Sequence, residues 1–208
     1  FCEYVHAKYS VAVCNATAAL HIAAMALGVK EGDNVICTPM TFASSANCIR
    51  FCGGNVKFVD IDPETYLLDI NKLKEILSTA PKGTYKGMVL VDFAGYPHNM
   101  EEYRKVADEY GMWILEDACH APGAYFIDST GERVYCGCGK YSDITVFSFH
   151  PVKHITTGEG GMACTQNKEY YEKMALYRTH GITHEAEKLQ REDGLWYYEM
   201  QELGYNYR

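Results

Sequence analysis

Short apolar runs alternate with longer amphipathic segments along most of the 208 residues. Runs with the length and apolar content of buried strands lie at 6–15, 33–39, 55–62, 86–95, 112–117 and 143–149. Helix-length segments lie between or after them, at 16–29, 41–53, 69–78, 99–111 and 169–181. This alternation predicts βαβ units. We therefore expect one α/β domain over 1–208, a three-layer α/β/α sandwich with a mostly parallel sheet.

Composition and charge narrow the class of protein. The formal net charge is -8 and no run is rich in lysine or arginine, which argues against nucleic acid or an anionic membrane as a partner. We find neither an apolar stretch of about 18 residues nor a signal-peptide pattern. The nine cysteines lie largely in apolar stretches. Free cysteine behaves there as a small hydrophobe, so we expect a reduced, cytoplasmic protein without disulfides.

Two patterns that suggest other sites fail on inspection. His150 and His154 have the spacing of helical zinc ligands, but Pro151 lies between them and no glutamate follows His150. Cys136 and Cys138 form C-x-C with no second pair, so we predict no metal site. The stretch "GCGKYS" (137–142) lacks the serine or threonine that a phosphate-binding loop needs after its lysine. The glycines of "GEGG" (158–161) predict a tight turn.

Three elements at the ends of predicted strands fit one chemistry. Lys153 follows the strand at 143–149 and could attack an aldehyde. Asp117 ends the strand at 112–117 and could hold a proton on a pyridine nitrogen. The stretch "NATAAL" (15–20) opens a helix whose free N–H groups suit a phosphate. Aldehyde, pyridine and phosphate together describe pyridoxal 5'-phosphate. Taken singly, such a lysine is usually solvated and such an aspartate is often a helix cap.

Five stretches occur in the order typical of a known enzyme family. They are "NATAALHIAAMALGVKEGDNVICTPMTFASSAN", "VDIDPETYLLD", "LEDACHAPGA", "FSFHPVKHITTGEGG" and "LGYNYR". With them the chain resembles the DegT/DnrJ/EryC1/StrS sugar aminotransferases, which are fold-type I pyridoxal-phosphate enzymes. Within that family, "VDFAGYP", "EDACHA" and "KYSDITVFSFHPVKHITTGEGG" resemble the branch of pseudaminic acid biosynthesis.

The resemblance implies a role for residues that match the family's motifs. Lys153 matches the Schiff-base lysine, and Asp117 matches the partner of the pyridine nitrogen. The other matches are Thr17, Ala18 and Ser148 for the phosphate, Phe42 stacked on the ring, His120 near the ring hydroxyl, Asn206 for the phosphate of a neighbouring subunit's cofactor, and His180 near the substrate.

The resemblance also implies a reaction. It is the transfer of an amino group from L-glutamate to the C4 ketone of a UDP-4-keto-6-deoxy-N-acetylhexosamine, in the biosynthesis of pseudaminic acid or a related surface sugar. Two alternatives stay open at this point: a sugar dehydratase of the same family, in which histidine replaces the lysine, and a non-catalytic ligand-binding or regulatory relative.

The same resemblance implies how the protein is assembled. We expect a homodimer with shared active sites. The chain begins without methionine and stops at "LGYNYR". We therefore expect residues 1–208 to be the large domain of a longer protein, with some N-terminal residues before it and a smaller C-terminal domain after it.

Overall fold

A seven-stranded sheet forms the centre of the protein, whose computed structural model describes residues 1–191 and 194–208. The strand order is β1-β9-β8-β5-β4-β2-β3. The strands are β1 (Tyr9–Val13), β2 (Asn34–Cys37), β3 (Asn55–Phe58), β4 (Tyr85–Val91), β5 (Trp113–Asp117), β8 (Ile144–Ser148) and β9 (Gly161–Thr165). Neighbours from β3 to β8 pair in parallel, whereas β9 is antiparallel to both β8 and β1. The predicted, mostly parallel sheet is therefore confirmed.

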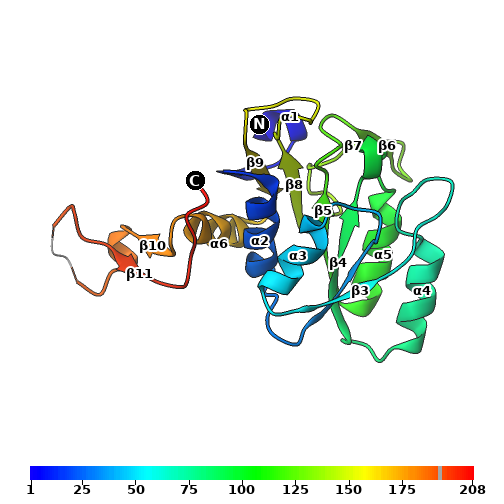
Figure 1. Cartoon of the computed structure of the whole chain (residues 1–208), viewed down its shortest axis with the longest axis horizontal. Coiled ribbons are helices and arrows are strands. Elements are labelled where there is room, and N and C mark those ends of the chain that lie inside the picture. The colour runs from blue at the N-terminus through cyan, green and yellow to red at the C-terminus, as the bar shows by residue number, and fades with distance from the viewer. Residues whose placement is uncertain (192–193) are drawn as a thin grey trace.

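Helices cover both faces of this sheet (Figure 1). One core packs α2 (Ala16–Ala26), α3 (Ser44–Phe51) and α6 (Lys168–Arg178) against the sheet, and the other packs α4 (Ile70–Thr79) and α5 (Met100–Tyr110). Side chains along a strand alternate between the two cores: Leu115 lies in the first and Ile114 in the second. The predicted three layers are thus present. A short helix, α1 (Cys2–Val5), precedes the first strand.

Local sequence explains where the helices begin and which face they bury. Asn15 caps α2 by accepting a hydrogen bond from the backbone N–H of Ala18 at 2.9 Å. The alanine-rich α2 is buried along nearly its whole length, because small side chains let it lie close to the sheet. Helix α4 buries Leu73 and Leu77, which lie one turn apart on the apolar face predicted from the sequence.

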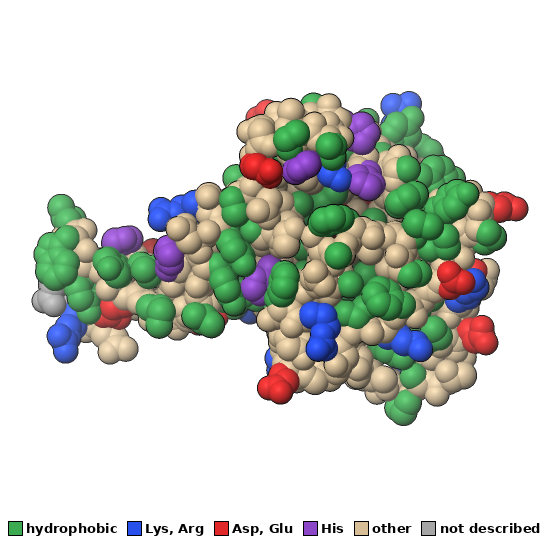
Figure 2. All heavy atoms as spheres, in the orientation of Figure 1, with side chains coloured by type: hydrophobic (Ala, Val, Ile, Leu, Met, Phe, Trp, Pro, Cys, Tyr) green, Lys and Arg blue, Asp and Glu red, His purple; other side chains and the backbone are tan. Residues whose placement is uncertain are grey.

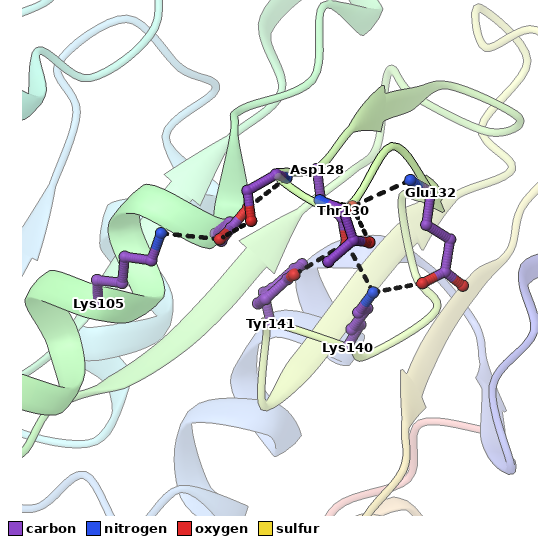
Figure 3. A network of polar contacts seen from close by, with 8 residues as sticks. Lys105, Asp128, Thr130, Glu132, Lys140 and Tyr141 are labelled. Atoms are coloured by element: carbon purple, nitrogen blue, oxygen red, sulfur yellow. Dashed lines mark hydrogen bonds and ion pairs between the residues drawn. The ribbon is translucent and has the colours of Figure 1, made fainter.

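The segment 126–142 forms a hairpin excursion from the sheet. Strands β6 (Tyr125–Ile127) and β7 (Arg133–Tyr135) pair antiparallel. Figure 3 shows the polar network that fastens this hairpin, centred on the carboxylate of Asp128. Lys140 donates to Asp128 at 2.7 Å and holds the pKa of that carboxyl below its usual range. Tyr141 and Thr130 donate to the same carboxylate. The excursion is therefore an ordered part of the domain.

The last part of the chain leaves the body and returns to it. The described residues of this arm, 182–191 and 194–203, include β10 (Ile182–Thr183), the short helix η2 (Ala186–Lys188) and β11 (Glu199–Met200), and they project to one side (Figure 1). Two backbone hydrogen bonds hold the returning segment to the body. The N–H of Tyr205 donates to the carbonyl of Tyr177 at 2.7 Å, and the N–H of Cys14 donates to the carbonyl of Tyr207 at 2.8 Å. Within 1–191 and 194–208, every helix is too short or too polar to cross a membrane.

Candidate functional site

A pocket opens where the carboxyl ends of β1, β5 and β8 meet the start of α2. Such strand ends are the usual location of sites in open α/β sheets. Six of the predicted side chains line this pocket together: Thr17, Phe42, Asp117, His120, Ser148 and Lys153. Asn15, Thr41, Ser44, Cys119, His150 and Glu159 are among the other lining residues. The fold thus brings residues that are far apart in the sequence to one surface.

The carboxylate of Asp117 is buried in the pocket and accepts hydrogen bonds on both oxygens. It is 5% exposed. Ser45 Oγ donates to its Oδ2 at 2.6 Å, and the N–H of Cys119 donates to its Oδ1 at 3.2 Å. Thr41 Oγ1 lies 2.7 Å from Ser45 Oγ and continues the chain of hydroxyls. Donors on both oxygens fix the orientation of the carboxylate, which a partner for a ring nitrogen requires.

The start of α2 offers backbone N–H donors at one end of the pocket. Asn15 already accepts the N–H of Ala18, so the N–H groups of Ala16 and Thr17 are those that lack an acceptor within the helix. Thr17 Oγ1 lies 2.7 Å from Ser44 Oγ. Ser148 Oγ accepts the N–H of His150 at 3.3 Å, which leaves its own proton for another acceptor. A phosphate would therefore meet two hydroxyls as well as the N–H groups.

A close backbone contact builds this end of the pocket. A Cβ on Gly161, the first residue of β9, would lie 2.4 Å from the carbonyl carbon of Asn15. Only glycine permits β9 to pass the start of α2 at that distance. Gly158, with φ of 80°, makes the turn before it. The predicted tight turn is confirmed, and the close approach at Gly161 lets the start of α2 lie against the sheet.

Lys153 and His120 lie on the two loops that frame the pocket. Lys153 is half-buried in the turn after β8, where its N–H donates to the carbonyl of His150 at 2.9 Å. The pKa of His120 is lowered by partial burial and then by the positive charge of Lys153, so the imidazole is neutral at pH 7. Its Nδ1 accepts the N–H of Ala94 at 3.3 Å, which places the ring proton on Nε2. Phe42 is 76% exposed beside the pocket, so its ring is available for stacking.

Three of the predicted residues do not line the pocket. Ala18 is buried, and its backbone N–H already donates to the side chain of Asn15. In this arrangement Ala18 has no free donor that could bind a phosphate. His180 and Asn206 are exposed on the segment where the arm leaves and rejoins the body. There the N–H of His180 donates to Tyr205, and Asn206 pairs with Thr179. The fold places both outside this chain's own pocket.

Sequence reasoning missed the hydroxyls that support Asp117 and Thr17. The helix predicted over 41–53 begins only at Ser44, because 41–43 form the loop that carries Phe42. Ser44 and Ser45 therefore lie in the first turn of α3, where they can turn toward the pocket. The one signal in the sequence was the pair of serines directly after "TFA", since serine favours the first turn of a helix.

Comparison with known proteins identifies relatives of the whole chain. The profile of the DegT/DnrJ/EryC1/StrS aminotransferase family matches residues 1–208. The UDP-4-amino-4,6-dideoxy-N-acetyl-beta-L-altrosamine transaminase of Campylobacter jejuni is 40% identical over 208 residues, which are 100% of this chain and 50% of that protein. The chain thus spans about half the length of the curated relatives it matches.

Solved structures agree with this comparison and confirm the predicted fold. Helicobacter pylori PseC, an aminotransferase involved in the biosynthesis of pseudoaminic acid, matches with a TM-score of 0.84 at 28% identity, over 100% of this chain and 51% of that chain. Bacillus subtilis NtdA, solved with bound cofactor PMP, matches with a TM-score of 0.76 at 31% identity, over 86% of this chain and 38% of that chain.

The geometry predicts that Ser45 stabilises the fold through Asp117. Replacing Ser45 with alanine removes a buried hydrogen bond to a carboxylate and should lower the free energy of unfolding by about 2 kcal/mol. Denaturant unfolding of the full-length protein measures this loss. Ser78→Ala is the control, because Ser78 donates to a backbone carbonyl on an exposed part of α4. We expect that change to stay within about 0.5 kcal/mol. Equal effects of the two substitutions would contradict the role given to Ser45.

Proposed function

Because the chain belongs to the DegT/DnrJ/EryC1/StrS aminotransferase family, we propose that its pocket binds pyridoxal 5'-phosphate and transfers amino groups. The observation that carries this proposal is that one pocket holds a lysine amine, an anchored carboxylate and a helix start with nearby hydroxyls. The amine of Lys153 can bind the aldehyde, and the carboxylate of Asp117 can bind the ring nitrogen. Thr17 and Ser148 can bind the phosphate. The exposed ring of Phe42 suits the flat face of the cofactor. The residues present therefore fit the group.

When bound, the cofactor supplies an electron sink that makes a carbon–hydrogen bond next to an amine acidic. The chain's own residues supply the rest. The amine of Lys153 would hold the aldehyde carbon and, once displaced by the amino donor, would take the proton from Cα of the donor and deliver it to the former aldehyde carbon. Asp117 keeps a proton on the ring nitrogen. The Nε2–H of His120 is available to the ring oxygen, because the Nδ1 of His120 is occupied by the N–H of Ala94.

We further propose L-glutamate as the amino donor and the C4 ketone of a UDP-4-keto-6-deoxy-N-acetylhexosamine as the acceptor. The name of the Campylobacter jejuni relative and the pathway of Helicobacter pylori PseC support this substrate class, and with it pseudaminic acid or a related surface sugar. Family members that act as dehydratases carry histidine in place of the lysine. Lys153, Asp117 and Ser148 all line one pocket, which argues against both a dehydratase and a non-catalytic relative.

The proposed protein is a homodimer in which each site draws on both subunits. Asn206 is exposed and lies outside this chain's pocket, as expected of a residue that serves a second copy. The arm beside it carries exposed apolar side chains, and Figure 2 shows them gathered on the projecting part. Leu195, Trp196 and Met200 are among them. A contact with a second subunit would cover such side chains.

All nine cysteines are free. Unpaired cysteines, four of them buried, suit a reducing compartment, which supports the cytoplasm as the location. That residues 1–208 form the large domain of a longer protein stays a prediction.

Lys153→Ala tests the proposed reaction. The purified full-length protein should be yellow and should convert L-glutamate to 2-oxoglutarate in the presence of a 4-keto nucleotide sugar. The variant should lose the colour and at least about 1,000-fold of the rate, because the change removes the amine that binds the aldehyde and moves the proton. Lys173→Ala changes a lysine that pairs with Glu169 on α6 and should leave both unchanged. A colourless wild-type protein that binds no pyridoxal phosphate would overturn the proposal.

Mixing two inactive variants tests the shared site. Lys153→Ala and Asn206→Ala each impair every site of their own homodimers. After the subunits are exchanged, half of the dimers are mixed and each holds one intact site, so roughly a quarter of the wild-type rate should return. No recovery, with exchange verified by native mass spectrometry, would place Asn206 and Lys153 in the same subunit's site. Full activity of the Asn206→Ala homodimer would remove Asn206 from the site.

A further inference from the structure

A second group of ionisable side chains lies behind the pocket, on the other face of β5. Glu116 precedes Asp117 in β5 and points the opposite way, as successive strand residues do. Glu116 meets Asp92, which follows β4, and Cys136, which follows β7. One ligand atom of each lies within 4.8 Å of the others. Asp92 is 0%, Glu116 3% and Cys136 5% exposed. The proposed reaction uses none of these groups.

Each carboxyl group has one oxygen that is fully hydrogen-bonded. The Oδ1 of Asp92 accepts the backbone N–H and the ring Nδ1–H of His98, at 3.0 and 2.9 Å. The Oε2 of Glu116 accepts the hydroxyls of Ser142 and Thr145, at 2.9 and 2.6 Å. In the part of the chain that the structure describes, the buried Oδ2 of Asp92 accepts no hydrogen bond. Two ionised carboxylates there would face each other without water.

We propose that Glu116 is a neutral carboxylic acid at neutral pH and that its Oε1–H donates to the Oδ2 of Asp92, so that the two groups hold one proton between them. The partners decide which group keeps the proton. Asp92 receives two N–H donors from His98, which favour its ionised form, and the nearby thiol of Cys136 shifts the pKa of Asp92 in the same direction. In neutral Glu116 the carbonyl oxygen is the one that accepts the two hydroxyls. Every polar atom of the pair then has a partner.

The electrostatic surroundings favour this arrangement. Burial raises the pKa of Glu116 to about 8, and the charge of Asp92 adds to that effect. Burial also raises the pKa of Asp92 to about 7. Burial lowers the pKa of His98 to about 3, so its bond to Asp92 is a hydrogen bond of a neutral imidazole and brings no positive charge.

Among the described residues, the other ionisable groups that act electrostatically on the pair come from several elements around it. They are Cys136 and Cys138 near the hairpin, Tyr103 on α5, Asp117 and Cys119 at the end of β5, and Cys164 on β9. None of these side chains is a cation at neutral pH. A second negative charge on the pair would therefore lie uncompensated among thiols, a phenol and the carboxylate of Asp117.

A metal ion explains the cluster less well than a proton does. Structural zinc sites take four ligands, and three candidate ligand atoms come together here within the described residues. Nδ1 of His98 is already bound to Asp92, and the cluster is closed to the water that would complete the coordination. A shared proton needs no further ligand.

The shared proton makes the region behind the pocket sensitive to alkaline pH. Asp92 is followed directly by the turn Phe93–Gly95, and that turn holds His120 through the N–H of Ala94. A Cβ on Gly95 would lie 2.7 Å from the carbonyl oxygen of His120, so the two turns are in close contact. When the proton leaves, Asp92 and Glu116 repel each other. This repulsion acts directly before the turn Phe93–Gly95, which holds the pocket residue His120.

Infrared spectroscopy of the purified full-length protein without cofactor tests the proton directly. At pH 7 the wild-type protein should show the C=O band of a protonated carboxylic acid, shifted in D2O and lost above about pH 9. Glu116→Gln and Asp92→Asn should each abolish the band, because the amide then supplies the donor and the remaining carboxyl ionises. Glu75→Gln, on the exposed face of α4, should leave it unchanged. Absence of the band in the wild-type protein, or one equivalent of bound metal by elemental analysis, would overturn the proposal.

Unfolding as a function of pH gives a second measurement. The pKa of Glu116 is about 8 in the folded protein, whereas that of a glutamate in an unfolded chain is near 4. Between these two pH values the folded state holds a proton that the unfolded state has released. Stability from this pair is therefore lost as pH rises through that window. The unfolding constant of wild type relative to Glu116→Gln should rise about tenfold per pH unit between about pH 5.5 and 7.5. Parallel curves for the two proteins would contradict the shared proton. Neither test depends on cofactor binding, so they can fail while the proposed function stands.

Discussion

The hydrogen bond from Ser45 to Asp117 joins the two parts of the fold that make the pocket. Ser45 lies in the first turn of α3 and Asp117 ends β5, and their side chains meet at 2.6 Å in a buried position. That contact fixes the loop that carries Phe42 and orients the carboxylate at the floor of the pocket. The strand order then places the other pocket residues, because β5 and β8 are neighbours in the sheet. Ser148 at the end of β8 and Lys153 in the turn after it therefore line the same pocket as Asp117.

The end of β5 carries two carboxyl groups that point to opposite faces of the sheet and have different hydrogen-bond partners. Asp117 faces the pocket and is held by a hydroxyl and an N–H. Glu116 faces a closed region that offers it hydroxyls and a second carboxylate, so it retains a proton in our proposal. Keeping Glu116 neutral limits the negative charge on this strand end. The strand can thus present one charged group to the pocket without a second like charge directly behind it.

The sequence predicts the layers of this fold and much of the pocket for simple reasons. Apolar periodicity is a local property, so the strands and helices could be located, and the ends of parallel strands meet at one edge of a sheet. That placed Asp117, Ser148 and Lys153 together. The role of Ser45 could not be predicted in the same way, because the true start of α3 depends on how residues 41–43 cross the end of the sheet. Glu116 escaped notice because its partner Asp92 is distant in the sequence. The positions of His180 and Asn206 depend on the path of the arm.

The central claim is that the pocket formed by the start of α2, Asp117 and the turn after β8 holds pyridoxal phosphate on Lys153. Borohydride reduction of the full-length protein after incubation with pyridoxal phosphate fixes the cofactor to its lysine, and peptide mass spectrometry then locates it. We predict a single stoichiometric modification on Lys153, blocked when inorganic phosphate at high concentration competes for the start of α2. Modification of a different lysine, or only scattered modification of exposed lysines, would contradict the claim.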